Sequence, residues 1–257
     1  MTLILTHLNR YGIIHASDSS LTAGDMDAGQ GQKTFEVPFL NAGLTVAGAF
    51  SVGREEMDIW MNDFIQSQAS VNGLTLSGFA HRLESELQSR MLPGEKDGGS
   101  MVHIAGYAKE GNTYHPEFWF ISNVHAIDRK TGEYGGIDYN FKSSEDFWTR
   151  DCPENNLMKR FQEHAGAYQI YVNGFAPGRI SYVFLQRVMN EFLRTVWGNP
   201  NWKFRPPQSL KETEILVKMY IQVIINLFLL SDYSARFIGG EPQIYAIPQP
   251  ENVVTSC

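Results

Sequence analysis

The chain has 257 residues, of which 43% are hydrophobic and 19% are charged, and its formal net charge is −7. This composition is typical of a folded globular protein of one large or two small domains and argues against a disordered chain. The negative charge, without any basic cluster, makes nucleic acid and anionic membranes poor partners. Two cysteines, Cys152 and Cys257, form no disulfide framework, so we expect the reducing environment of the cytoplasm.

Neither the N-terminus nor the most apolar stretch predicts a membrane protein. His7, Asn9 and Arg10 interrupt the first residues too early for a signal peptide. The stretch 215–230 carries polar residues at four-residue spacing and is shorter than a typical span, so it predicts a mostly buried helix. The seven histidines are scattered without metal-ligand spacing, and we expect no metal or cofactor.

Four strand-like runs fill the first fifty residues. They are residues 2–8, the run that begins at Ile13, residues 33–37 and residues 44–48. A turn at residues 9–12 joins the first two as a hairpin, and a polar loop precedes the third.

Two amphipathic helices follow. The first is predicted over residues 52–69, where Met57, Trp60, Met61 and Phe64 recur at helical spacing. The second begins near Leu76 and ends near residues 92–94. Both apolar stripes predict packing against a sheet.

The remaining elements are less regular. Strands are predicted at residues 101–108 and 117–124, joined by a turn at 109–115, and at residues 168–172. Residues 128–156 form a long irregular region. A helix is predicted from Pro177-Gly178 to Val196, and a longer one from a Ser209/Glu212 capping box to about residue 233 or 237. A final strand covers residues 243–247.

The order of these elements indicates the fold class. Helices come in pairs, and each pair follows a block of strands, which differs from an alternating parallel arrangement. We therefore predict an α+β fold with two stacked antiparallel sheets between helix pairs, a four-layer αββα sandwich. It would be a single domain over residues 2–248, with a flexible tail at 249–257.

The second residue is the candidate nucleophile. Removal of Met1 would leave Thr2 with a hydroxyl group and a free α-amine on one residue. The hydroxyl could attack an amide carbonyl while the amine, with a pKa of about 8, accepts the proton. A nearby lysine would lower the pKa of both groups through its charge, and an aspartate would hold that lysine. Backbone N–H groups at a glycine turn such as Gly48 could bind the oxyanion.

Each of these residues also has an ordinary structural interpretation. A threonine after Met1 is common, Asp18 could belong to a turn, and Lys33 could open a solvated strand. Their order and spacing, however, match a known pattern. Asp18 lies sixteen residues after Thr2, within Asp-Ser-Ser-Leu-Thr-Ala-Gly, and Lys33 begins a strand region that leads to Ala47-Gly48-Ala49.

This segment resembles the start of proteasome β-type subunits and their bacterial relatives, the HslV-like peptidases, within the N-terminal-nucleophile (Ntn) hydrolases. The resemblance implies that Thr2 is the nucleophile, that Asp18 and Lys33 form the charge pair that tunes it, and that the Gly48 N–H is the oxyanion donor. It further implies that Thr22 and Ala49 bind the substrate backbone and that Val46 lines a pocket for a small or medium apolar side chain. Thr22 and Ala49 would then hold the substrate as an added strand.

The chain also departs from the family pattern. The arginine of the family motif is Ser20 here, and the mid-chain turn at Asn173-Gly174 lacks the family's serine. The family's C-terminal motif is Asp-x-x-Ser-Gly-Gly, and here additional residues separate Asp232 and Ser234 from Gly239-Gly240. Asp232 and Ser234 therefore either support the threonine or simply end a helix. These departures leave open an alternative, a non-catalytic proteasome-like scaffold that retains Met1.

The resemblance also implies partners. Identical subunits would assemble into a ring or spiral that encloses the sites, a peptide or protein would be the substrate, and an ATP-dependent unfoldase is a possible partner. A conventional serine or metal hydrolase has little support, because the sequence lacks Gly-x-Ser-x-Gly and His-Glu-x-x-His. We therefore predict a cytoplasmic threonine peptidase or amidase.

Overall fold

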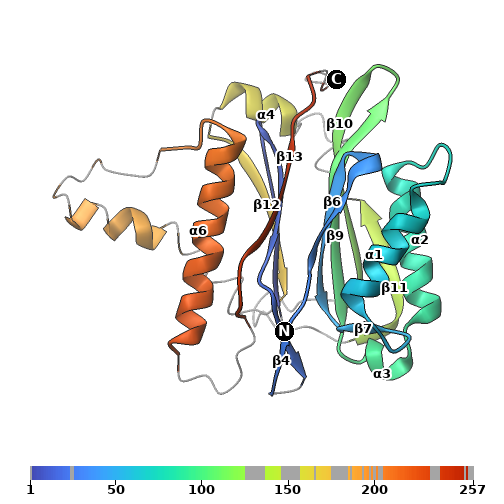
Figure 1. Cartoon of the computed structure of the whole chain (residues 1–257). Coiled ribbons are helices and arrows are strands. Elements are labelled where there is room, and N and C mark those ends of the chain that lie inside the picture. Colours follow the sequence, from blue (N-terminus) through green and yellow to red (C-terminus); the bar gives the residue numbers. More distant parts are fainter. Residues whose placement is uncertain are drawn as a thin grey trace.

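The computed structural model describes residues 2–23, 26–124, 137–145, 157–164, 166–174, 185, 187–192, 194–196, 198, 201, 205–231, 238–251 and 253. Within these residues, two antiparallel sheets face each other and helices lie on their outer sides (Figure 1). The chain is therefore of the predicted α+β class.

The first sheet has the N-terminal hairpin at its centre. Its strands run in the order β12-β1-β2-β13, and every neighbouring pair is antiparallel. Their bounds are Tyr168–Gly174 for β12, Leu3–Asn9 for β1, Gly12–Ser17 for β2 and Gln243–Pro248 for β13. Because Leu3 pairs with Gly174, the end of β12 lies directly beside the first residues of the chain.

The second sheet is larger and has the order β11-β10-β9-β6-β5, again antiparallel throughout. Its strands are Ile137–Glu145 (β11), Thr113–Val124 (β10), Ser100–Glu110 (β9), Ala42–Gly48 (β6) and Thr34–Val37 (β5). Two small hairpins stand apart from both sheets. They are β3–β4 (Ser20–Ala23 and Met26–Gln30) and β7–β8 (Ser51–Val52 and Glu55–Glu56).

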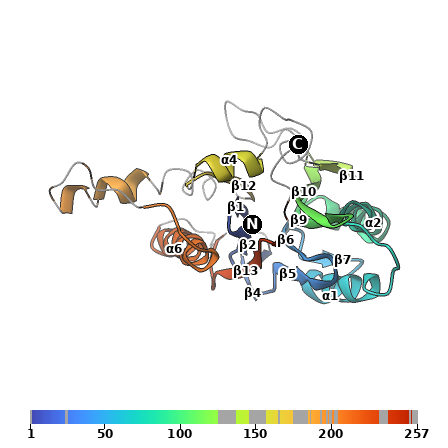
Figure 2. The same cartoon turned by 90° about the horizontal axis from the view of Figure 1, so that it is seen from above.

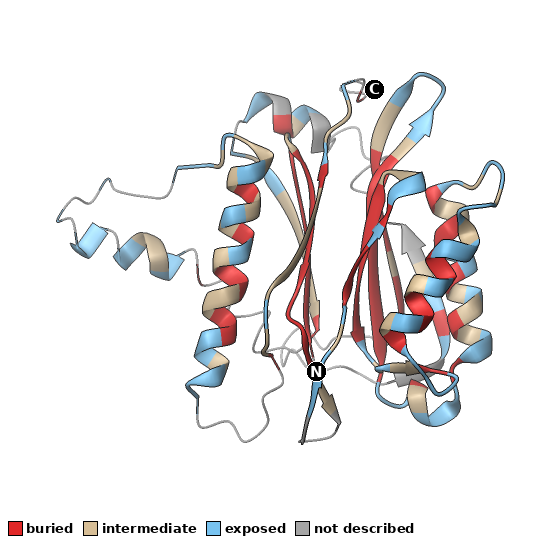
Figure 3. Cartoon of the chain, in the orientation of Figure 1, coloured by how far each residue is buried: buried red, intermediate tan, exposed pale blue. Residues whose placement is uncertain are grey.

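Helices cover the outer face of each sheet. The helices with described bounds are α1 (Met57–Gln68), α2 (Leu76–Arg90), α3 (Pro93–Lys96), α4 (Leu157–Glu163), α6 (Leu210–Leu229) and the 3-10 turn η1 (Pro38–Leu40). Helices α1 and α2 lie on the second sheet, whereas α6 lies on the first (Figures 1 and 2). Buried residues gather on the strands and on the helix faces toward them (Figure 3). The apolar stripe predicted for α1 is buried.

Strand β1 shows why the sheets stack as they do. Its side chains alternate between two apolar environments, and all seven residues are buried. Leu3 and Leu5 pack with residues of α6, whereas Ile4 packs with Ala47 and Leu8 with strands of the second sheet. A strand whose side chains are buried on both faces must lie in an inner layer.

A polar network also joins the two sheets. Thr6 Oγ1 lies 3.2 Å from His15 Nδ1 and 3.1 Å from His103 Nδ1, and His103 Nε2 lies 2.8 Å from Asn173 Oδ1. Burial lowers the pKa of His15 to about 4 and that of His103 to about 3. The rings are therefore neutral near pH 7, and the network fixes Asn173, the residue before Gly174.

Several predicted boundaries are wrong, each for a local reason. The predicted polar loop after β2 contains the β3–β4 hairpin. The first helix begins at Met57 instead of residue 52, because residues 51–56 form the β7–β8 hairpin. The turn between β9 and β10 is only Gly111 and Asn112, because the ladder continues to the pair Thr113 and Glu110. Strand β12 extends through Gly174, two residues beyond the predicted end.

Helix α6 begins as predicted. Ser209 is its N-cap and accepts a hydrogen bond from the Glu212 N–H at 3.1 Å. The second half of the predicted capping box differs, since the Glu212 carboxylate accepts from the N–H of Gln208. The helix ends at Leu229, earlier than predicted. None of the described helices is long and apolar enough to cross a membrane.

Two further predictions are only partly covered. Of the helix predicted after Pro177-Gly178, the described positions 185, 187–192 and 194–196 are helical, and its beginning lies outside the described residues. In the predicted tail, the Gln249 N–H donates to Tyr11 O at 3.0 Å, and Val253 is buried beside Tyr114.

Candidate active site

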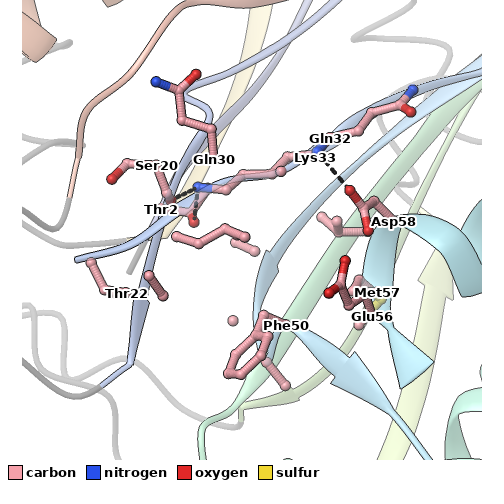
Figure 4. Close-up of a pocket in the computed structure, with 17 residues that line it drawn as sticks. Thr2, Ser20, Thr22, Gln30, Gln32, Lys33, Phe50, Glu56, Met57 and Asp58 are labelled. Atoms are coloured by element: carbon pink, nitrogen blue, oxygen red, sulfur yellow. Dashed lines mark hydrogen bonds between the residues drawn. The ribbon is translucent and has the colours of Figure 1, made fainter. Parts of the chain in front are cut away.

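A pocket opens at Thr2, directly before β1. Figure 4 shows Thr2 and Lys33 on one side of this pocket, with Phe50, Glu56 and Met57 across from them. The lining residues are Thr2, Ser20, Leu21, Thr22, Ala28, Gln30, Gly31, Gln32, Lys33, Val46, Ala47, Gly48, Ala49, Phe50, Glu56, Met57 and Asp58. They come from the residue that precedes β1, from β6 of the second sheet, from both small hairpins and from the start of α1, so the pocket lies where these parts of the fold meet.

The amino group of Lys33 is the centre of the site. Lys33 Nζ lies 2.7 Å from Thr2 Oγ1 and 3.3 Å from Asp18 Oδ2, and it also donates to the carbonyl oxygen of Ser20. Three acceptors therefore surround the three N–H donors of an ammonium group. The side chain donates to the Thr2 hydroxyl oxygen, which leaves the hydroxyl proton free to move to another acceptor.

Asp18 connects this lysine to the backbone. Its Oδ1 accepts from the N–H of Leu3 at 2.9 Å, and its Oδ2 accepts from the N–H of Gly239 at 3.2 Å. Leu3 immediately follows Thr2, so one carboxylate orients both the lysine and the chain segment that carries the hydroxyl. Asp18 has no exposed surface, and Thr2 and Lys33 are 5% and 4% exposed.

Burial changes the pKa of both charged groups. It lowers the pKa of Lys33 below the usual lysine range, while the charge of Asp18 opposes this shift. Burial also raises the pKa of Asp18, against the charge of Lys33 and the bonds from Leu3 and Gly239. Each group depends on the other to remain charged, so loss of either one leaves a buried charge without compensation.

Two glycines allow the backbone to approach the site closely. Gly174 has φ +106°, and a Cβ atom there would lie 1.9 Å from the carbonyl oxygen of Thr2. Gly48 has φ +111°, and a Cβ atom there would lie 1.8 Å from the carbonyl oxygen of Gly99. Any side chain at Gly174 would displace Thr2, and any side chain at Gly48 would displace the pocket wall.

The C-terminal strand holds the segment that carries Lys33. The side chain of Gln243 accepts from the N–H groups of Lys33 and Thr34 at 2.7 and 3.1 Å. It also donates to Gly31 O at 2.8 Å. One side chain therefore fixes the backbone on both sides of Lys33, which makes Gln243 a positioning residue.

We expect Gln243→Ala to destabilise the protein by about 1–3 kcal/mol, because two partly buried N–H groups lose their acceptor. It should also move Lys33 relative to Thr2 and lower any hydrolytic activity. Urea unfolding and kcat/KM measure the two effects. Gln222→Ala is the control, since that glutamine bonds to Asn226 on its own helix. Equal stability of the two variants would contradict the positioning role.

The residues predicted from the sequence meet at this pocket. Thr2, Asp18 and Lys33 are in contact, and the predicted oxyanion and substrate residues all line the pocket: Thr22, Val46, Gly48 and Ala49. The predicted supporting residues Asp232 and Ser234 lie outside the described residues.

Sequence analysis missed three kinds of contribution to this site. These are the Ser20 carbonyl group, the Gln243 side chain and the acidic residues Glu56 and Asp58. The backbone carbonyl has no residue-type signal, and the others come from segments assigned only to a strand or a helix.

Comparison with known proteins does not assign a family to this chain. No protein-family model and no curated protein matches the chain.

Proposed function

We propose that this protein is an N-terminal-threonine peptidase or amidase of proteasome type, with Thr2 exposed by removal of Met1. The observation that carries the proposal is the 2.7 Å contact between Lys33 Nζ and Thr2 Oγ1 in a buried site. A lysine ammonium hydrogen-bonded to a hydroxyl oxygen lowers the pKa of that hydroxyl, which is what a weak nucleophile requires.

The fold assignment belongs to the same proposal. We assign the two facing antiparallel sheets and their outer helices to the four-layer αββα sandwich of the Ntn hydrolases. This assignment is consistent with α6 on one side and α1 and α2 on the other. Assembly of identical subunits into a compartment follows from the same resemblance and is proposed with it.

The mechanism uses groups within this pocket. The freed α-amine of Thr2 accepts the hydroxyl proton, and Oγ1 attacks the substrate carbonyl carbon. The carbonyl oxygen takes the negative charge, for which the backbone N–H of Gly48 is the proposed donor. The C–N bond then breaks, the leaving amine takes the proton from the α-amine, and an ester on Thr2 remains. Water cleaves this ester by the same sequence and restores the hydroxyl group.

The roles of Lys33 and Asp18 in this cycle are electrostatic. The ammonium stabilises negative charge as it develops on Oγ1, and its charge favours the unprotonated α-amine. Asp18 keeps the ammonium in place and fixes Leu3, so that Oγ1 does not rotate away from the pocket.

The proposal is tested by the N-terminal mass and by one substitution. We expect the purified protein to lack Met1 and to hydrolyse acyl-peptide amides. Thr2→Ala should reduce kcat/KM at least a thousandfold, since it removes the nucleophile. Thr113→Ala, at the exposed start of β10, is the matched control and should behave as wild type.

Intact Met1 together with equal rates for wild type and Thr2→Ala would reject the hydrolase. The same result would favour the non-catalytic scaffold, because an α-amine blocked by Met1 cannot accept a proton. The missing serine at Asn173-Gly174 motivates that alternative.

A further inference from the structure

The wall of the pocket across from Thr2 carries negative charge. Glu56 and Asp58 line it at the start of α1, and Figure 4 shows both beside Met57. The only positively charged residue among the described lining residues is Lys33, and it is already paired with Asp18. The pocket therefore has an excess of negative charge on the side away from the nucleophile.

The contacts of these two carboxylates differ. Asp58 accepts from the N–H of Gln32 at 3.2 Å and from the N–H of Ile59 at 2.9 Å. Glu56 is the N-cap residue of α1, yet its side chain makes no capping bond. In the part of the chain that the structure describes, neither carboxylate has a cationic partner.

Stabilisation of helix α1 explains the acidic side chain at Asp58 but not the one at Glu56. A carboxylate in the first turn of α1 interacts favourably with the helix dipole, and Asp58 has this place. Glu56 precedes the helix and leaves its carboxylate available in the pocket. The helix dipole therefore accounts for Asp58 but does not explain why Glu56 extends into the pocket.

The pocket that holds the nucleophile and the acids also has apolar lining residues. They are Val46, Ala47, Ala49, Phe50 and Met57. An aliphatic chain could pack there while a terminal cation reaches the carboxylates, as lysine and arginine side chains commonly do. Sequence analysis predicted that Val46 lines a pocket for a small or medium apolar side chain of the substrate. The same apolar surface would instead hold the aliphatic part of a longer, charged side chain.

We propose that the pocket selects amide substrates with a cationic side chain, of the lysine or arginine type, on the acyl side of the scissile bond. The cation binds Glu56 and Asp58, and its aliphatic stem packs on Val46 and Met57. This inference depends on the proposed function, because the scissile bond is defined by the position of Thr2.

The test compares arginine with citrulline, which has nearly the same shape but no charge. Acetyl-peptide amides that differ only in this residue are used with the full-length protein. We expect kcat/KM to be about tenfold higher for arginine. Glu56→Gln should reduce the arginine-to-citrulline ratio about threefold to fivefold, the range for exposed ion pairs, and Glu56→Gln with Asp58→Asn should bring it near one. High salt should reduce the ratio in wild type.

Glu55→Gln is the matched control. Glu55 is exposed and lies next to Glu56 in β8 but does not line the pocket. Its substitution should leave the ratio unchanged. If Glu55→Gln lowers the ratio as much as Glu56→Gln, the selection arises from general surface charge and the inference is overturned.

Binding to the Thr2→Ala variant separates this inference from the proposed function. Preferential binding of the arginine peptide, reduced in Glu56→Gln and lost in Glu56→Gln with Asp58→Asn, supports the cation site even if the wild-type protein cleaves nothing. Hydrolysis at equal rates for arginine and citrulline overturns the cation site and leaves the proposed function intact. Absence of both preference and turnover overturns both.

Discussion

Replacing Lys33 by methionine is expected to reduce kcat/KM for amide hydrolysis about a thousandfold. Methionine keeps most of the length of the buried stem but removes the ammonium group that contacts Thr2 Oγ1 and Asp18 Oδ2. The hydroxyl group then loses its charged donor, and the α-amine loses the neighbouring charge that favours its unprotonated form. Steady-state kinetics with a fluorogenic peptide amide measure the effect.

The pH profile identifies the group responsible. The rate should rise as the α-amine loses its proton, at or below a pH of about 8. It should fall again as pH rises through the pKa of Lys33, which burial places below the usual lysine range. Lys33→Met should lack this falling limb. A falling limb of the same midpoint in the variant would contradict the role of Lys33.

Lys96→Met is the control for the loss of a buried lysine. Lys96 is also buried, but its Nζ donates to Gln88 O, away from the pocket. It should lose stability and retain activity. A similar loss of activity in both variants would indicate a folding defect instead of a catalytic effect.

The fold was accessible from the sequence where a single pattern dominates. The stripe of α1, the Ser209 cap of α6 and the apolar runs of the first strands all depend on neighbours within one element. The β3–β4 hairpin was missed because most of its residues are polar or small, and its two large apolar residues, Leu21 and Met26, do not form the apolar alternation that marks a strand.

The candidate site likewise contains residues that the sequence predicts and residues that it does not. Thr2, Asp18 and Lys33 lie within 31 residues of each other, and their residue types match one chemistry. Gln243 lies 210 residues after Lys33, and its role arises only because β13 brings it beside the Lys33 segment. Glu56 precedes a helix whose sequence predicts packing alone. Such contributions depend on tertiary neighbours, which one sequence does not provide.

Asp18→Asn is expected to destabilise the fold by about 3–5 kcal/mol, the cost of leaving one partner of a buried ion pair uncompensated. The amide cannot neutralise Lys33, and only one of its two polar atoms accepts hydrogen bonds. Asp18 uses both of its oxygens, toward Leu3 and toward Gly239 and Lys33. The amide nitrogen must therefore face a donor. Urea unfolding measures the change in the free energy of unfolding.

The double variant Asp18→Asn with Lys33→Met shows whether the loss comes from the unpaired charge. Removing the lysine as well leaves no buried cation, so the double variant should be about 2 kcal/mol more stable than Asp18→Asn alone. Glu86→Gln, which breaks the exposed pair with Arg90, should cost less than about 1 kcal/mol and sets the scale for a surface pair. If the double variant is no more stable than Asp18→Asn, the carboxylate acts through its backbone bonds to Leu3 and Gly239. The pairing with Lys33 would then not be the reason this acid is buried beside Thr2.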